Sequence, residues 1–196
     1  MRFFIALDID DGIRQRIQRF VEGVSGFAAD ARWVHPESLH VTLKFIGEKP
    51  ADMVDEIKRA VAAGKSEAFQ IRFRGYGFFP TAKSPRVFWV GIESGPQLAD
   101  LAMAVDEATS KLGIPKEDHV YSPHLTLARG GSRRSGAPSR QKTDGPNRSF
   151  QKLQEKLAAL PSPEFGTMTA REFFLYQSQL MRGGARYTKI ERFGLS

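Results

Sequence analysis

The spacing of apolar and polar residues divides the first third of the chain into alternating strands and helices. Period-2 alternation predicts a strand at 3–7, and apolar residues at helical spacing predict an amphipathic helix at about 11–24. A second strand is expected at about 39–46, ended by Gly47. A helix then follows over about 50–64, with proline in its first turn and glycine after its last.

The middle of the chain follows a related order. Segments 69–79 and 86–93 have the composition of two strands, and the turn-rich sequence PTAKSP separates them. A helix is expected at about 96–112, and a further strand at about 123–129. The alternation of short strands with helices therefore continues through most of the sequence.

The last third begins with a segment of different composition. Residues 130–149 are rich in Gly, Ser, Pro and Arg and have no apolar periodicity, which predicts a flexible basic loop. A helix is expected at about 150–160, because its leucines fall on one face. The final strands are expected within 167–178 and 186–193.

One short motif occurs twice, 84 residues apart. SLHVTLKFIG (38–47) and SPHLTLARGG (122–131) share the pattern Ser-x-His-x-Thr-Leu, and each copy is followed by a predicted helix and two strands. The repeat is therefore a supersecondary unit. Two such units predict a bilobal α+β fold with two antiparallel sheets, flanking helices and an approximate twofold axis. We expect residues 1–196 to form a single domain, with the motif strands facing each other across a central cleft.

Strand geometry places the polar residues of each motif together. Because side chains two apart in a strand point to the same face, His40 lies beside Thr42, and His124 lies beside Thr126. The intervening valine and leucines point the other way, toward the core. The expected cleft is therefore lined by two imidazoles and two hydroxyl groups.

Two histidines supply what acid–base chemistry at neutral pH requires. An ordinary imidazole pKa of about 6.5 allows one ring to act as base while the other remains a protonated acid. The threonine hydroxyls are suited to donating hydrogen bonds to an anionic group held between them. A phosphodiester fits this arrangement, and a cyclic phosphate fits it best, because its leaving oxygen stays tethered.

The motifs and their flanks resemble a known family. The chain is similar to the two-histidine (2H) phosphoesterases with paired H-x-T-x signatures, and in particular to the bacterial and archaeal RNA 2′,3′-cyclic phosphodiesterases, also called 2′-5′ RNA ligases. The similarity spans nearly the whole chain and rests on these segments: RFFIALDI, WVHPESLHVTLKFIGE, FPTAKSPRVFWVGI, YSPHLTLAR, FFLYQSQL and GARYTKIERF. It implies an active site in the central cleft and a reaction without metal or other cofactor.

The resemblance also implies roles for individual residues. A terminal 2′,3′-cyclic phosphate would be hydrolysed to a 2′-phosphate, with ligation as the reverse reaction. His40 would protonate the departing 3′ oxygen, and His124 would activate the water. The two motif threonines would hold the phosphoryl oxygens. Phe45 and Arg129, five residues after each histidine, would contact substrate, although simple strand alternation puts both on the wrong face unless a bulge or the strand end turns them.

Composition and charge narrow the setting. The chain has no cysteine, which excludes disulfides, thiolate zinc sites and cysteine nucleophiles, and which fits a cytoplasmic location. The start of the chain has the pattern of a first strand rather than of a signal peptide, and no apolar run is long enough for a membrane helix. The net charge is +7, but residues 129–152 hold seven arginines and lysines against one aspartate. The basic character is therefore concentrated near the 130–149 loop, which is either an RNA-holding flap or a solvated insertion.

Other interpretations of the same residues stay open. His35 and His119 lie five residues before the motif histidines, which raises a metal site as a rival, but threonine is a poor ligand and no carboxylate accompanies the motifs. The motif strands could be purely structural. The substrate could be a small cyclic nucleotide or ADP-ribose cyclic phosphate, or the cleft could bind nucleotides with little turnover. A monomer is expected.

Four aromatic residues near the predicted strands have two possible roles. They could stack on RNA bases, as aromatic side chains do in many single-strand binding sites. Aromatics beside strands are more often part of the core, which is the interpretation favoured here. The four are Trp33, Tyr76, Phe79 and Tyr121.

Overall fold

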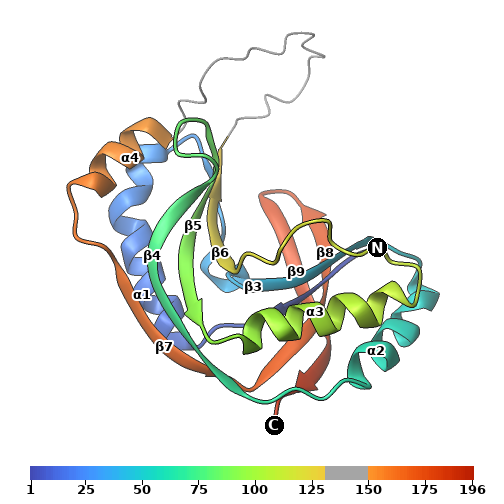
Figure 1. Ribbon diagram of the computed structural model, residues 1–196. Coiled ribbons are helices and arrows are strands. Elements are labelled where there is room, and N and C mark those ends of the chain that lie inside the picture. Colours follow the sequence, from blue (N-terminus) through green and yellow to red (C-terminus); the bar gives the residue numbers. More distant parts are fainter. Residues whose placement is uncertain (131–149) are drawn as a thin grey trace.

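Two antiparallel sheets form the framework of the computed structural model, which describes residues 1–130 and 150–196 (Figure 1). Sheet A has the strand order β3-β1-β8-β9 and sheet B the order β2-β6-β5-β4-β7. The strands of sheet A are β3 (Val41–Glu48), β1 (Arg2–Leu7), β8 (Glu172–Met181) and β9 (Gly184–Gly194). The strands of sheet B are β2 (Arg32–Trp33), β6 (His124–Arg129), β5 (Pro85–Ser94), β4 (Phe69–Pro80) and β7 (Glu164–Ala170).

The described residues include four α-helices, which lie in two pairs, α1 with α4 and α2 with α3 (Figure 1). α1 contacts β7 of sheet B, and α3 contacts β3 of sheet A. The helices are α1 (Asp11–Val24), α2 (Val54–Ala62), α3 (Gln97–Ser110) and α4 (Gln151–Ala158), with short 3₁₀ helices η1 (Ser25–Ala28), η2 (Pro36–Ser38) and η3 (Ala51–Met53). Within the described residues, no helix combines the length and apolar character that crossing a membrane requires.

The two sheets correspond strand by strand. The order β3-β1-β8-β9 matches β6-β5-β4-β7, and β2 is an additional edge strand next to β6. β3 and β6 carry the two motifs and contact each other. The predicted α+β fold with two related antiparallel sheets is therefore confirmed. The predicted basic loop, apart from Gly130, lies outside the described residues.

Each half of the chain contributes strands to both sheets, which the sequence did not indicate. β4, which follows the first motif, joins sheet B, whereas β8 and β9, which follow the second, join sheet A. The single strand predicted at 167–178 is in fact two strands, β7 and β8, which separate at Arg171 and enter different sheets. Alternation shows which face a residue occupies but not which strand it pairs with, so this exchange leaves no local signal.

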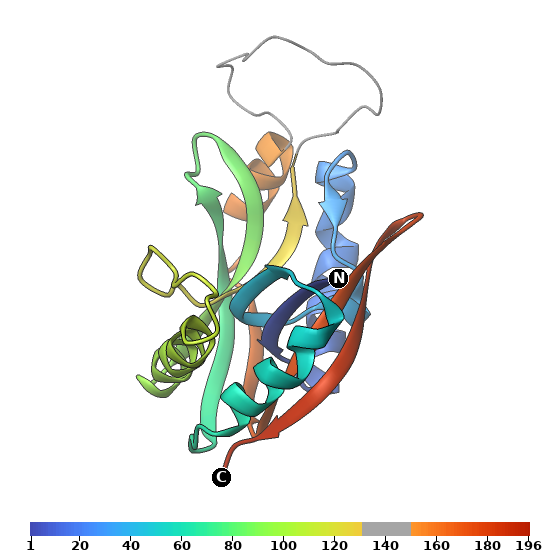
Figure 2. The ribbon, with the colours of Figure 1, turned by 90° about the vertical axis from the view of Figure 1, so that its right-hand side faces the viewer.

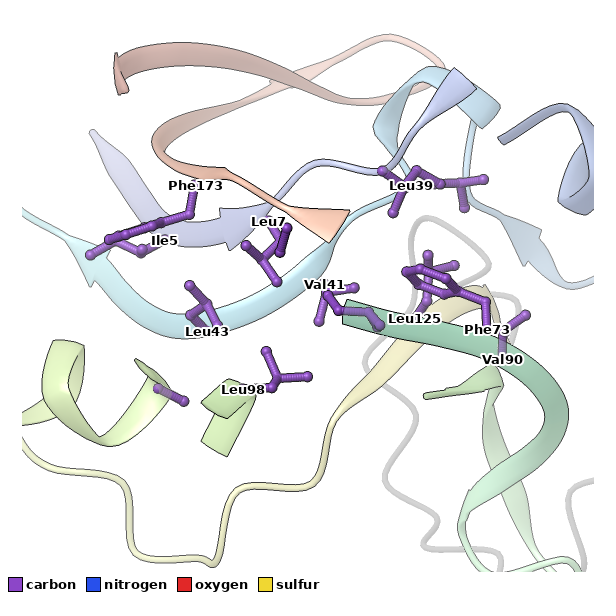
Figure 3. Close-up of a cluster of buried hydrophobic side chains, with 14 of the residues drawn as sticks. Ile5, Leu7, Leu39, Val41, Leu43, Phe73, Val90, Leu98, Leu125 and Phe173 are labelled. Carbon is purple, nitrogen blue, oxygen red and sulfur yellow. The ribbon is translucent and has the colours of Figure 1, made fainter. Parts of the chain in front are cut away.

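One hydrophobic cluster fills the space between the sheets and their helices. Val41 and Leu43 of β3 and Leu125 and Leu127 of β6 all belong to it. Figure 3 shows several of these side chains together with Ile5 and Leu7 of β1 and Leu98 of α3. The inward orientation predicted for the apolar motif residues is thus correct, and both halves contribute to the same core.

Sheet A also has a second, smaller apolar cluster on its other face. Phe4, Ala6, Phe174 and Tyr176 are buried there, and Tyr187 packs against them. Because side chains alternate along a strand, β1 is buried on both faces: Phe3, Ile5 and Leu7 point into the main core and Phe4 and Ala6 into this cluster. The second cluster forms the surface on which His40 lies.

Candidate active site

The two motif histidines are held by the same backbone contact. His40 immediately precedes β3, and its Nδ1 is 2.7 Å from the carbonyl oxygen of Ser38. His124 is the first residue of β6, and its Nδ1 is 2.8 Å from the carbonyl oxygen of Ser122. Because a carbonyl oxygen only accepts hydrogen bonds, Nδ1 carries the proton in both rings. Each Nε2 is therefore the nitrogen that can exchange a proton with a bound molecule.

The motif threonines lie on the same sheet faces as their histidines. Thr42 is opposite Ala6 of β1, a member of the cluster beneath His40. Thr126 is opposite Trp89 of β5, whose ring lies 6.4 Å from that of His124. Both threonine side chains are half-buried. The structure therefore brings each histidine and threonine pair together as strand geometry predicts.

A register shift follows each motif threonine. It falls between Ile5 and Ala6 in the pairing of β1 with β3, and between Phe88 and Trp89 in the pairing of β5 with β6. An extra residue at such a bulge reverses the alternation of the residues that follow.

The bulges determine where the residues five positions after each histidine point. Phe45 contacts Phe4 of the cluster under His40, with ring centroids 6.2 Å apart. Arg129 lines the cleft next to His40. Phe45 and Arg129 thus lie on the same side as the histidines, as the sequence required if a bulge was present.

Burial lowers the pKa of both histidines. The His40 ring packs against Phe4 at 4.8 Å and edge-on against Tyr187 at 5.3 Å. The His124 ring packs edge-on against Phe79 at 4.9 Å. Desolvation by these surroundings is the main cause of the lowered pKa values, and hydrogen bonds to the serine carbonyls partly oppose it.

Nearby charges act differently on the pKa values of the two histidines. The Arg129 guanidinium lowers the pKa of both His40 and His124. The Asp8 carboxylate raises the pKa of His40, and no carboxylate in the described part of the chain acts in this way on His124. The site therefore has a cation shared by the two histidines and an anion beside one of them.

Asp8 belongs to a network that sequence reasoning missed. Its Oδ1 accepts a hydrogen bond from Arg14 Nη2 at 2.5 Å and its Oδ2 one from Lys189 Nζ at 2.7 Å. Burial would raise the pKa of Asp8, but these contacts and the Ile9 amide reverse that effect and lower it. Arg14 also donates to the carbonyl of Pro36 at 2.6 Å, in the turn that leads to His40. In the sequence, Asp8 is only a polar residue directly after the first predicted strand. Its position beside His40 depends on the pairing of β1 with β3, which the sequence does not show.

Hydrogen bonds of Tyr121 and Lys44 tie β3 to α3 and to the segment that leads into β6. The Tyr121 hydroxyl donates to the backbone carbonyl of Thr42 at 2.8 Å, and burial raises the pKa of Tyr121. Lys44 is buried and donates to Asp106 Oδ1 and to the carbonyl of Pro115, both at 2.6 Å. These contacts fix the first half of the site relative to the approach to the second.

The other aromatic and histidine candidates occupy different places. Trp33, Tyr76 and Tyr121 pack against the main core, as favoured from the sequence, whereas Phe79 contacts His124. His35 lines the cleft. Among residues 1–130 and 150–196, no three His, Cys, Asp or Glu side chains form a group that could hold a metal ion.

A cleft of about 920 Å³ opens beside His40. Its lining includes Asp8, His40, Arg129, Tyr176 and Tyr187. His124, Thr42 and Thr126 are not part of this lining. The cleft is therefore lined by residues of β2 and η2 and by the β8–β9 hairpin, together with His40 and Arg129.

Comparison with known proteins points to one family. Residues 7–89 and 90–187 match the family model described as LigT like Phosphoesterase. The boundary between the two matches falls in β5, so that each match contains one histidine motif. A curated protein of Methanothermobacter thermautotrophicus is 34% identical over 199 residues, covering 100% of this chain and 99% of its own length. One of Archaeoglobus fulgidus is 32% identical, covering 98% of this chain and 99% of its own length. Both are named RNA 2′,3′-cyclic phosphodiesterase.

Solved structures show the same architecture. A crystal structure of a Thermus thermophilus protein superposes with a TM-score of 0.76 at 28% identity, covering 100% of this chain and 98% of that one. The crystal structure of E. coli LigT complexed with 3′-AMP superposes with a TM-score of 0.77 at 25% identity, with the same coverage. The likeness therefore extends over both sheets, including the two motif strands.

Proposed function

The chain belongs to the LigT-like phosphoesterase family, and on this basis we propose that it is an RNA 2′,3′-cyclic phosphodiesterase. Its substrate is an RNA end that carries a 2′,3′-cyclic phosphate, and its product is a 2′-phosphate with a free 3′ hydroxyl. The names of the full-length relatives support RNA over ADP-ribose cyclic phosphate or a pure binding role. 2′-5′ ligation is the reverse of the same displacement.

His124 acts as the base in this proposal. Its Nε2 accepts a proton from water while the water oxygen forms a bond to phosphorus. Burial and the Arg129 charge both lower the pKa of His124, which keeps the ring neutral at neutral pH and able to accept the proton. The hydrogen bond from Nδ1 to the Ser122 carbonyl holds the ring and stabilises the positive charge that develops on it.

His40 acts as the acid. As the bond between phosphorus and the 3′ oxygen breaks, the protonated Nε2 gives its proton to that oxygen. The Asp8 carboxylate favours this protonated form, because it raises the pKa of His40. A lowered pKa from burial also makes the imidazolium a stronger acid once it is formed.

Thr42, Thr126 and Arg129 bind the phosphoryl group. The two hydroxyls donate to the non-bridging oxygens, on which negative charge gathers in the transition state. The Arg129 guanidinium, which acts electrostatically on both rings, compensates that charge. Phe45, which is 60% exposed, offers an apolar surface for the substrate.

The observation that carries this proposal is the repeated histidine contact. Two imidazoles present free Nε2 atoms because both Nδ1 atoms bind a serine carbonyl two residues earlier. A threonine follows each of them on the same face. A pair of rings fixed in the same tautomer is the arrangement that an in-line acid–base displacement requires.

The test is to identify the product. An oligoribonucleotide with a terminal 2′,3′-cyclic phosphate is incubated with the protein in excess EDTA, and the products are resolved by ³¹P NMR. We expect complete conversion to the 2′-phosphate, and ADP-ribose cyclic phosphate in a parallel reaction to be hydrolysed more slowly. Accumulation of the 3′-phosphate, or binding without turnover, would rule the proposal out. The H40N/H124N variant serves as the control for contaminating nuclease.

A further inference from the structure

The cleft beside His40 extends well beyond the residues of the two histidine motifs. Its volume of about 920 Å³ is near the upper end of the ~300–1,000 Å³ range of small-ligand pockets. One wall comes from β2 and η2, and the other from the β8–β9 hairpin. Because His40 and Arg129 belong to its lining, a molecule that contacts His40 can extend into the cleft.

The lining of the cleft has an excess of permanent cations. The cationic residues are Arg32, Arg129, Arg186 and Lys189, and the acidic residues are Asp8 and Glu37. Asp8 is already bound by Arg14 at 2.5 Å and by Lys189 at 2.7 Å. Arg32, Arg129 and Arg186 form no ion pair with another residue of the described ranges. Arginines without carboxylate partners along a groove are typical of surfaces that contact a phosphate backbone.

The β8–β9 hairpin adds an exposed apolar surface at the rim. β1 pairs with β8 only as far as Ser178, so beyond this point the hairpin has no third strand and projects from sheet A (Figure 2). Its tip presents Leu180, 80% exposed, and Met181, 53% exposed, and both line the cleft. Arg182 and Gly183 form the turn, and Gly183 and the first residue of β9, Gly184, have positive φ angles of 95° and 135°. Apolar side chains beside free arginines suit an unstacked base next to a phosphate.

We propose that this cleft binds the nucleotides that precede the terminal one, so that the preferred substrate is a single-stranded RNA 3′ end. The proposal rests on the function proposed above and adds the path of the RNA. The terminal cyclic phosphate lies between His40 and His124. The strand then runs past Arg129, between β2 with Arg32 and the hairpin with Arg186. Bases contact the apolar side chains at the rim.

Kinetics with two substrates test the path. kcat/KM is measured for cytidine 2′,3′-cyclic phosphate and for a pentaribonucleotide with the same 3′ end, using the wild type, R32A, R186A and R182A. Arg182 is the matched control, because it lies on the same hairpin but does not line the cleft. The wild type should favour the pentanucleotide, and R32A and R186A should each lower that preference by about tenfold, as expected for the loss of one charge-assisted contact. R182A should keep it.

Added salt gives an independent readout. For the pentanucleotide, the slope of log(kcat/KM) against log salt should be shallower by about 0.7 in R186A, the value for one phosphate contact on a single strand. Equal kcat/KM values for the two substrates in the wild type would overturn the cleft assignment. An R182A effect as large as that of R186A would also overturn it, because it would indicate a general charge effect of the hairpin. Failure of the proposed function is distinct, since then neither substrate would be hydrolysed.

Discussion

The two halves of the site share their backbone and differ in their charges. In both, a histidine Nδ1 binds the carbonyl of a serine two residues earlier, at 2.7 Å and 2.8 Å. A threonine follows on the same face, and a bulge follows the threonine. The repeated sequence therefore accounts for the tautomer and orientation of both rings. These are the features that the acid and the base of the site share.

What differs lies beside the repeat. His124 pairs with Gly91, where an added Cβ would lie 2.5 Å from the carbonyl oxygen of Arg74 and no carboxylate fits. On the other side, Asp8 follows β1 and raises the pKa of His40. Five residues after the histidines stand an apolar Phe45 and a cationic Arg129. A few residues outside the repeated Ser-x-His-x-Thr-Leu pattern therefore distinguish the His40 side of the site from the His124 side.

The largest expected effect comes from removing either ring. We expect H40A and H124A each to lose about 10²- to 10⁴-fold in kcat, the usual contribution of a general acid or base. The double variant should lose little more than the worse single one, because the two rings act as a unit. Single-turnover assays measure this, and circular dichroism checks the fold. A double loss equal to the product of the single losses would mean that the rings act independently.

A smaller effect tests Phe45 and Arg129, which lie five positions after the two histidines. Removing the guanidinium in R129Q should lower kcat/KM by about tenfold to a hundredfold, the value of a charge-assisted hydrogen bond. Because Arg129 lowers the pKa of both histidines, both limbs of the pH profile should also move to higher pH. F45A, at the corresponding position, should leave the limbs in place. A shift of the limbs in F45A but not in R129Q would reverse the assignment.

The Asp8 carboxylate gives a more selective test of direction. D8N should lower the pKa of His40, because the charge that raises it is removed. If His40 is the acid, the alkaline limb of kcat/KM moves to lower pH and the acidic limb stays. A shift confined to the acidic limb would instead make His40 the base. The measurement is a pH profile from about pH 5 to about pH 9 at constant ionic strength, a range that brackets the ordinary imidazole pKa.

The smallest effect concerns stability in mild acid. Both histidines have lowered pKa values in the folded protein, so folding favours their neutral forms. This contribution to stability is complete above the unfolded pKa of about 6.5 and is lost as the pH falls through the lower folded values. Tm should therefore fall between about pH 6.5 and about pH 5, and fall less in H40N/H124N. The exposed His119, changed to Asn, is the matched control; an equal flattening there would contradict the account.

Several features of the site could be read from the sequence because they are local. Alternation correctly placed Val41 and Leu43 in the core and His40 and Thr42 on the opposite face. Helical periodicity gave the bounds of α1 as observed, since Ile13 and Ile17 mark its buried face. Strand parity also indicated that a bulge or the strand end must turn the residues five positions after each histidine.

The remaining features depend on pairing, which no local pattern encodes. The exchange of β4 and β8 between sheets, the two-residue strand β2 and the split at Arg171 were all missed. Asp8 was missed for the same reason: only the register of β1 against β3 places it next to His40. The parts of the site that distinguish its two halves are therefore the parts that required the structure.

The pH profiles of the single variants test most directly that His40 is the acid and His124 the base. With wild-type protein, kcat/KM for an RNA 2′,3′-cyclic phosphate should be bell-shaped, with apparent pKa values that belong to the pair. The residual activity of H40A should lack the alkaline limb, and that of H124A should lack the acidic limb. A bell that persists unchanged in either variant would contradict the assignment of acid and base to these two histidines.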